Sequence, residues 1–152
     1  MIKVIKAKQI FTGNKVIHKG VIVIDGEKLA AVGSEEEKIS IPIANEVIDF
    51  GDNTILPGLI DSHTHLALSG QMPNYAAAMK DDTLILTLRA ARNIRADLLS
   101  GVTTMRCLGE KDFIDVAIKE AVEKEIIPGP RLLISGKGIR SSYGHGIMVT
   151  AF

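Results

Sequence analysis

Hydrophobic and polar positions follow two different patterns along the chain, and the change between them falls near residue 54. Before that point, short runs of β-branched residues alternate with Gly, Asn, Asp and Pro, which is typical of strands joined by turns. Turn residues at Thr12-Gly13-Asn14 and at Asp25-Gly26 predict hairpin connections. We therefore expect residues 1–54 to form a small β region arranged as a meander.

From residue 55 onward, strand-like runs alternate with longer helical patterns. Short apolar runs at 55–60 (ILPGLI), 102–108 (VTTMRCL) and 131–135 (RLLIS) have the length and the bounded character of buried strands. We expect these three runs to be neighbouring core strands in that order.

Two amphipathic helices are predicted between these strands, over about 83–99 and 113–126. Asp81 or Asp82 offers an N-cap for the first helix, and Asp112 offers one for the second. The apolar positions expected to face the core recur at helical spacing. In the first helix they are Leu84, Ile85, Leu88, Ala91, Ile94, Leu98 and Leu99, and in the second Ile114, Ala117, Ile118, Ala121 and Val122.

The alternation of strand and helix with short joints predicts an α/β fold with parallel strands and right-handed crossovers. A doubly wound sheet and the start of a (β/α)₈ barrel both fit this spacing. A barrel unit takes about 30 residues, so the chain after residue 54 has room for three units and not for eight. Helices on one face of the sheet would favour the barrel, and helices on both faces the doubly wound sheet.

Composition excludes several classes of protein. The chain is 46% hydrophobic and 24% charged, with 18 basic and 18 acidic side chains that cancel. It should therefore fold, and it lacks the basic surface expected for binding nucleic acid or an anionic membrane. No apolar stretch is long enough to span a bilayer. The single cysteine, Cys107, and an N-terminus without a signal-like apolar segment predict a cytoplasmic protein in which Cys107 is a buried structural thiol.

The sharpest chemical feature is the pair His63 and His65, which directly follows the first predicted core strand. Residues i and i+2 of a strand point to the same side, so the two imidazoles can lie together at the carboxyl end of that strand. Active sites of parallel α/β folds lie there, and paired imidazoles are suitable zinc ligands. Two exposed loop histidines are the alternative. Asp61 is expected to orient a histidine or accept backbone N–H groups rather than to bind metal.

At this point the sequence resembles the metal-dependent amidohydrolase superfamily. The segment ILPGLIDSHTHL is similar to the first-strand signature of that family, and GVTTMRCLGE to its second strand. The preceding segments VIDGEKLAAVG and EVIDFGDNTILPG resemble the N-terminal part of its small β-sandwich. The later segments GPRLLISGKGI and SYGHG resemble the branch that contains imidazolonepropionases and Xaa-Pro dipeptidases.

The resemblance implies that the chain is the N-terminal portion of such an enzyme. Residues 1–54 would be part of the β-sandwich, and residues 55–152 the first three βα units of an incomplete TIM barrel. His63 and His65 would bind the more buried of one or two divalent cations, usually zinc. The family takes its other ligands and its general base from later strands, so no catalytic residue is expected within this chain. The whole enzyme would hydrolyse a carbon–nitrogen bond of a small amide, cyclic amide or dipeptide with a metal-activated water.

Three further residues are candidates for substrate binding. Tyr143 and His145 lie after the third predicted strand, and Arg106 lies at the end of the second. A loop histidine and an inward-facing, salt-bridged arginine are the respective alternatives for His145 and Arg106. Cys107 stands where relatives often carry Asp, and it has no evident base partner.

A second hypothesis is that the chain is a truncated, non-catalytic fragment. Three parallel strands leave open sheet edges and an apolar face, so such a fragment should form oligomers or associate with a chain that carries the C-terminal part.

Overall fold

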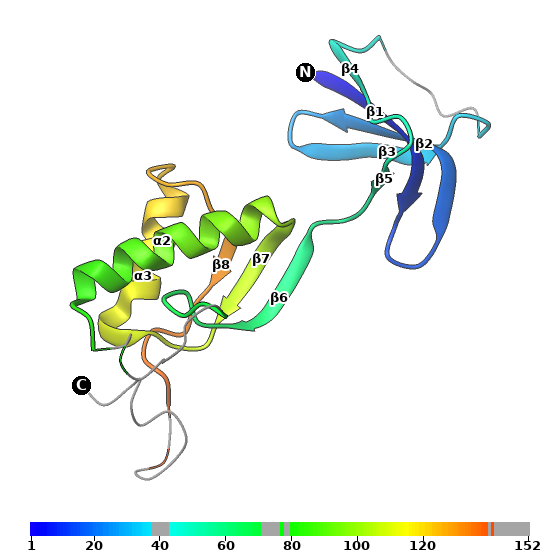
Figure 1. The fold of residues 1–152 in the computed structure, drawn as a ribbon. Coiled ribbons are helices and arrows are strands. Elements are labelled where there is room, and N and C mark those ends of the chain that lie inside the picture. Colours follow the sequence, from blue (N-terminus) through cyan, green and yellow to red (C-terminus); the bar gives the residue numbers. More distant parts are fainter. Residues whose placement is uncertain (38–42, 71–76, 78–79, 140, 142–152) are drawn as a thin grey trace. The chain divides into compact units, whose positions relative to one another are not determined.

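A computed structural model describes most of the chain, namely residues 1–37, 43–70, 77, 80–139 and 141. The chain divides into two compact units, residues 1–57 and residues 58–152. Figure 1 shows strands β1 to β5 in the first unit, and strands β6 to β8 with two labelled helices in the second. No helix in the described part of the chain is long and apolar enough to cross a membrane.

The first unit is a five-stranded sheet in the order β3-β2-β1-β4, with β5 also paired to β1. Its strands are β1 (Ile2–Phe11), β2 (Val16–Asp25), β3 (Lys28–Ser34), β4 (Glu46–Asp49) and β5 (Thr54–Ile55). The two predicted hairpins are present, because β1 pairs antiparallel with β2, and β2 with β3. The buried side chains of this unit form two apolar clusters, one around Val4, Val21 and Val23 and the other around Ile10, Ile17 and Ile22.

The predicted meander is wrong for the last strands of this unit. β4 does not continue from β3 but pairs parallel with β1, and β5 does the same further along β1. Parallel pairing needs a crossover connection, and the chain between residues 34 and 46 is long enough to return to the free edge of β1.

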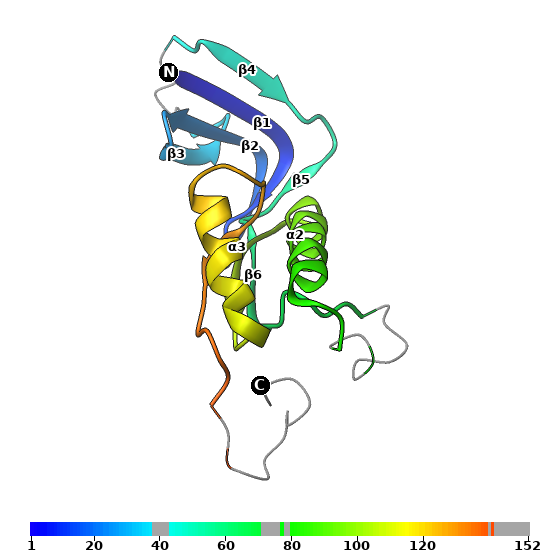
Figure 2. The ribbon, with the colours of Figure 1, turned by 90° about the vertical axis from the view of Figure 1, so that its left-hand side faces the viewer.

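The second unit contains three parallel strands in the order β6-β7-β8, as the sequence predicts. Its elements are β6 (Leu59–Thr64), α2 (Thr83–Leu99), β7 (Val102–Cys107), the 3₁₀ turn η1 (Lys111–Phe113), α3 (Ile114–Glu123) and β8 (Arg131–Leu133). Figure 2 shows α2 and α3 together on one side of the strands. One apolar cluster joins both helices to Met105, Cys107 and Leu132 of the strands, so a single face of this sheet carries both helices.

The first core strand begins four residues later than predicted. Ile55 belongs to β5 in the first unit, and β6 starts at Leu59. Pro57 and Gly58 separate the two strands, because proline has no N–H to donate to a ladder. β6 is also less buried than predicted, since Leu59 and Ile60 are 54% and 72% exposed.

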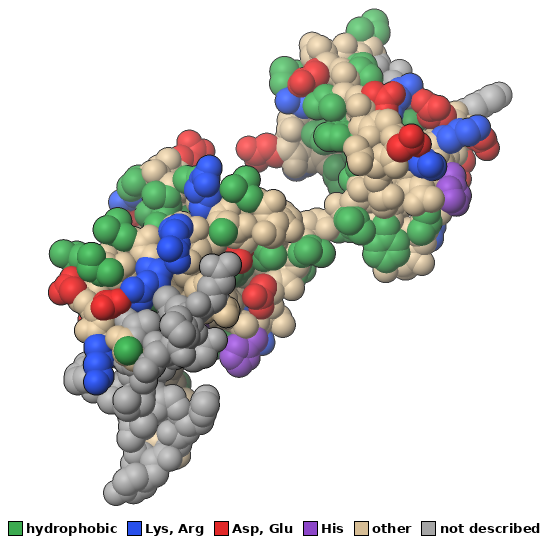
Figure 3. Space-filling model, in the orientation of Figure 1, with side chains coloured by type: hydrophobic (Ala, Val, Ile, Leu, Met, Phe, Trp, Pro, Cys, Tyr) green, Lys and Arg blue, Asp and Glu red, His purple; other side chains and the backbone are tan. Residues whose placement is uncertain are grey.

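The buried face of α2 differs from the predicted one. Of the three fully buried residues of this helix, Ile94 confirms the prediction, whereas Leu86 and Ala90 were not predicted. Four of the predicted core positions are exposed: Leu84, Ile85, Leu88 and Leu99. Apolar side chains occupy more than one face of this helix, so periodicity alone does not identify the face that packs on the sheet. Figure 3 shows hydrophobic side chains on the surface of the second unit over α2.

One predicted helix cap is present and the other is wrong. The Asp82 carboxylate accepts the Leu84 N–H at 2.8 Å and caps α2. Asp112 does not cap α3, because it lies within η1 with a positive φ and accepts the hydroxyl of Thr83. The chain enters α3 through Phe113 in the left-handed region, without a side-chain cap.

Candidate metal centre at the strand ends

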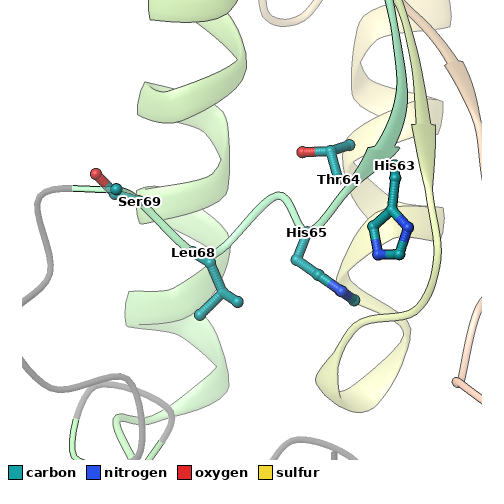
Figure 4. A pocket seen from close by; sticks show the side chains of 6 residues that line it. His63, Thr64, His65, Leu68 and Ser69 are labelled. Carbon is teal, nitrogen blue, oxygen red and sulfur yellow. The ribbon is translucent and has the colours of Figure 1, made fainter.

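An extra residue in β6 determines where the two histidines point. Thr64 lies opposite Cys107 of β7, whereas Asp61 lies opposite the residue two positions before Cys107. Three steps along β6 therefore match two steps along β7, which is the definition of a β-bulge. Thr64 faces the helices like buried Cys107, and His63 and His65 face the opposite side. Figure 4 shows Thr64 pointing toward α2 and both histidines pointing away from it.

The two imidazoles lie close together at the carboxyl end of β6. Their ring centroids are 5.8 Å apart and the ring planes make an angle of 72°. Both rings line an open pocket of about 230 Å³ together with Thr64, Leu68 and neighbouring backbone (Figure 4). His63 is exposed and His65 is half-buried, so the ring of His63 is the more accessible to solvent.

Hydrogen bonds hold the ring of His65 and the backbone of His63. The Nδ1 atom of His65 lies 2.9 Å from the Gly109 carbonyl oxygen. A carbonyl can only accept, so this contact requires the proton of a neutral His65 on Nδ1 and leaves the Nε2 lone pair free. The Asp61 carboxylate accepts the backbone N–H of His63 at 3.0 Å, which confirms the predicted role of Asp61.

The loop after β6 is held by a side chain of α2. Asn93 donates through Nδ2 to the carbonyl oxygens of Leu66 and Leu68, at 2.9 and 2.8 Å. Two carbonyls that would otherwise be without a helix or sheet partner are satisfied in this way. The backbone that follows His65 is therefore fixed to the helix that packs behind it.

A buried carboxyl group lies beside the same loop. Glu110 is 1% exposed, and its Oε1 atom accepts the Ala67 N–H at 3.3 Å. Burial raises the pKa of Glu110, and the hydrogen bonds from the loop and the nearby His65 oppose that shift. Burial also raises the pKa of the adjacent Cys107 thiol to about 12, and the charge of Glu110 adds to this effect. The prediction of a buried thiol at Cys107 is confirmed.

Arg106 lies on the same face of the sheet as the two histidines. It alternates with the buried residues of β7, and its Nε donates to the Ser62 carbonyl oxygen at 2.7 Å. Its side chain is exposed, and the described residues include no ion pair to it. Tyr143 and His145 lie outside the described residues.

Apart from Asp61, the residues that hold the histidine segment were not predicted from the sequence. Asn93 lies on the true core face of α2, seven residues after Leu86 and three after Ala90, so a correct choice of face would have identified it. Glu110 falls in the polar segment GEKD, where a buried carboxyl has no distinguishing signal. Within the described residues, no group of three or more His, Cys, Asp or Glu side chains could hold a metal ion together.

Comparison with known proteins places this chain in a family. The sequence profile of the amidohydrolase family matches residues 54–144. The chain belongs to this family. An imidazolonepropionase of Fusobacterium nucleatum is 34% identical over 100 residues, which cover 58% of this chain and 24% of that protein. An imidazolonepropionase of Alkaliphilus metalliredigens is 44% identical over 63 residues, which cover 40% of this chain and 15% of that protein.

Solved structures of amidohydrolases resemble this chain along most of its length. A Xaa-Pro dipeptidase with bound methionine in its active site matches 95% of this chain and 36% of that chain, with a TM-score of 0.80 and 27% identity. A prolidase complexed with N-methylphosphonate-L-proline matches with a TM-score of 0.78 and 28% identity, covering 96% of this chain and 34% of that one. These relatives confirm the predicted branch. This amidohydrolase chain spans about a quarter of the first curated relative and about a third of these structures.

Proposed function

We propose that this chain supplies two ligands, His63 and His65, to the divalent metal site of an enzyme that hydrolyses a carbon–nitrogen bond. The observation that carries the proposal is the pair of imidazoles at the carboxyl end of β6, on the face away from the helices, with ring centroids 5.8 Å apart. The family match supports the same chemistry. The bond is that of an amide, a cyclic amide or a dipeptide.

The donor set fits a zinc ion. Neutral imidazole nitrogen is a preferred zinc ligand, and the contact between His65 Nδ1 and the Gly109 carbonyl leaves Nε2 to bind the metal. When bound, one or two divalent cations supply Lewis-acid activation of water and of the scissile carbonyl. A catalytic zinc takes three protein ligands, and the described residues offer only the two histidines. The remaining ligands and the general base therefore come from outside the described part of the chain.

We assign substrate binding to Arg106, with Tyr143 and His145 as further candidates from the family resemblance. The guanidinium of Arg106 is exposed on the histidine face, and its Nε donates to the Ser62 carbonyl oxygen. A planar guanidinium pairs well with a carboxylate. A dipeptide or an imidazolone acid carries such a group, so Arg106 would orient the substrate relative to the two imidazoles.

We interpret the second unit as three βα units of an incomplete (β/α)₈ barrel, preceded by part of a β-sandwich. Parallel order and helices on one face of the sheet support this interpretation. The opposite face would then line the barrel, with the metal site at its carboxyl-terminal mouth.

A second candidate function is association without catalysis. Ile60 and Leu133 are 72% and 52% exposed, and β6 and β8 are the edge strands of the described sheet. Exposed apolar residues and open edges favour oligomers or a complex with a chain that supplies further barrel strands.

Zinc titration of the purified chain tests the proposed ligands. His63→Ala and His65→Ala should each weaken Zn²⁺ binding at least tenfold, as measured by competition with a chromophoric chelator. His18→Ala is the matched control, because His18 is an exposed histidine of the first unit and should leave the affinity unchanged. Equal affinity in all variants would contradict the proposed ligands.

An activity assay separates the two functions. Dipeptides, N-acyl amino acids and imidazolone rings are offered with Zn²⁺, Mn²⁺ or Co²⁺ to the chain alone and to the chain combined with one that carries further barrel strands of this family. We expect hydrolysis only in the second case. Metal-dependent turnover by the chain alone would show that it holds a complete site, and inactivity of both would favour the association function.

A further inference from the structure

One peptide unit connects the loops that follow all three parallel strands. The carbonyl oxygen of Gly109 lies 2.9 Å from His65 Nδ1, in the loop after β6. The N–H of the same peptide unit, which belongs to Glu110, donates at 2.9 Å to the Gly136 carbonyl oxygen, in the loop after β8. The C=O and N–H of a trans peptide point in opposite directions, so this unit spans the distance between the two outer loops.

The side chain of Glu110 adds a third connection. Its Oε1 atom accepts the N–H of Ala67, which follows His65 by two residues and is itself fully buried. The Cys107 thiol lies 3.7 Å from the same oxygen, within hydrogen-bond distance for sulfur. The side chain of Glu110 thus contacts the backbone two residues after His65, while the peptide unit between Gly109 and Glu110 contacts the His65 ring.

This carboxyl group is costly to bury. Oε2 of Glu110 has no hydrogen-bond partner among the described residues, and an unsatisfied buried polar atom costs about 1–3 kcal/mol. A leucine would fill a similar volume without an unpaired side-chain oxygen. The contact of this carboxyl group with the loop after β6, at the Ala67 N–H, offers a reason for its presence.

We propose that Glu110 is a positioning residue that holds the loop after β6 so that the His65 ring donates from Nδ1 to Gly109 and presents Nε2 to the metal. The inference rests on the proposed function only in treating His65 as a ligand. A histidine in water carries its proton mainly on Nε2, and in that tautomer Nε2 cannot bind a metal. Holding the ring against the Gly109 carbonyl selects the other tautomer before any metal arrives.

Nitrogen-15 NMR of the metal-free chain tests this directly, because long-range couplings distinguish the two tautomers of each neutral histidine. We expect His65 in the Nδ1–H form and exposed His18 mainly in the Nε2–H form. An Nε2–H tautomer at His65 in the unsubstituted chain would overturn the proposal by itself.

Substitutions at Glu110 test whether its carboxyl group determines the tautomer of His65. Glu110→Asp shortens the side chain by one methylene, so its carboxyl no longer reaches Ala67, and a mixture of His65 tautomers is expected. Glu110→Gln keeps an oxygen for the Ala67 N–H and should retain the Nδ1–H form. Glu125→Gln, at an exposed position of the same unit, is the control and should change nothing.

Zinc affinity then links positioning to function. Loss of a group that orients a ligand typically weakens metal binding about 10–100-fold, and we expect this loss in Glu110→Asp with recovery in Glu110→Gln. Unchanged tautomer and affinity in Glu110→Asp would refute the proposal. If the chain binds no zinc but the tautomer still responds to Glu110→Asp, the metal site fails and the positioning role stands. If His63 and His65 bind zinc and Glu110→Asp changes neither the tautomer nor the affinity, the metal site stands and the positioning role of Glu110 fails.

Discussion

The His65 ring and the Gly109 carbonyl, 44 residues apart in sequence, meet at a distance of 2.9 Å. Gly109 is well suited to this position for two reasons. Its φ of +119° is one that residues with a side chain rarely adopt, and a Cβ added there would lie 2.6 Å from the Gly138 nitrogen. The contact that orients the candidate ligand therefore depends on a residue without a side chain.

We predict that Gly109→Ala destabilises the second unit by several kcal/mol, through backbone strain and the clash with Gly138. Gly101→Ala is the matched control, because Gly101 also has a positive φ, of +95°, but an added Cβ would only touch Leu59 at 4.0 Å. Strain alone should cost about 1 kcal/mol there. Urea denaturation followed by circular dichroism measures both. Equal losses in the two variants would mean that the close approach to Gly138 contributes nothing.

Asn93→Ala should destabilise the second unit by about 1–3 kcal/mol, because it leaves the Leu66 and Leu68 carbonyls without their donor. Arg95→Ala changes an exposed side chain of the same helix and should stay within about 0.5 kcal/mol of the unsubstituted chain. Denaturation midpoints provide the comparison. Indistinguishable midpoints for the two variants would show that Asn93 does not hold the loop.

Cys107 should resist thiol reagents in the folded chain. Burial raises the pKa of its thiol to about 12, so at pH 8 only about one molecule in ten thousand carries the reactive thiolate. We expect no labelling by iodoacetamide over an hour at pH 8, and one label per chain in 8 M urea, as seen by intact mass. Rapid labelling without denaturant would mean that the apolar core around Cys107 opens frequently.

The buried carboxyl of Glu110 should make stability depend on pH in an unusual direction. Its pKa is raised in the folded chain, so between the unfolded and folded pKa values the folded state binds more protons. Stability contributed by Glu110 is therefore present below the unfolded pKa and is lost as the pH rises toward the folded value. Replacement by glutamine removes this loss. Relative to Glu110→Gln, the unsubstituted chain should become less stable from pH 4 to pH 8 in urea denaturation, and a constant difference would contradict the raised pKa.

The sequence predicts the elements of this chain well and the packing within it less well. The Asp82 cap and the extent of α2 follow from local signals that act within a few residues, and the order of β6, β7 and β8 follows from the alternation of strands and helices. The parallel return of β4 to β1 depends on which sheet edge is free, and that is a property of the assembled sheet. Likewise, the choice of Leu86 rather than Leu88 as a core residue of α2 depends on the surface that the helix meets.

For the candidate site, the sequence predicts the candidate ligands and the role of Asp61, but not the distant residues that hold the ligands. His63 and His65 form a short, recognisable spacing. The contacts that orient them come from Asn93, Gly109 and Glu110, more than 25 residues away, and each is unremarkable within its own segment. Long-range hydrogen bonds leave no periodic trace in a sequence, so only the folded arrangement reveals them.

The bulge in β6 makes the number of residues between Asp61 and Thr64 as important as their identity. Strict alternation from Asp61 through His65 would turn both imidazoles toward the helices, and the extra residue of the bulge keeps them on the opposite face. Substitutions at Ser62 should accordingly be better tolerated than an inserted residue, which would disrupt the pairing of Thr64 with Cys107. In alignments and in engineering of this segment, an insertion between Asp61 and Thr64 therefore signals a changed register at the candidate metal centre, even where both histidines remain.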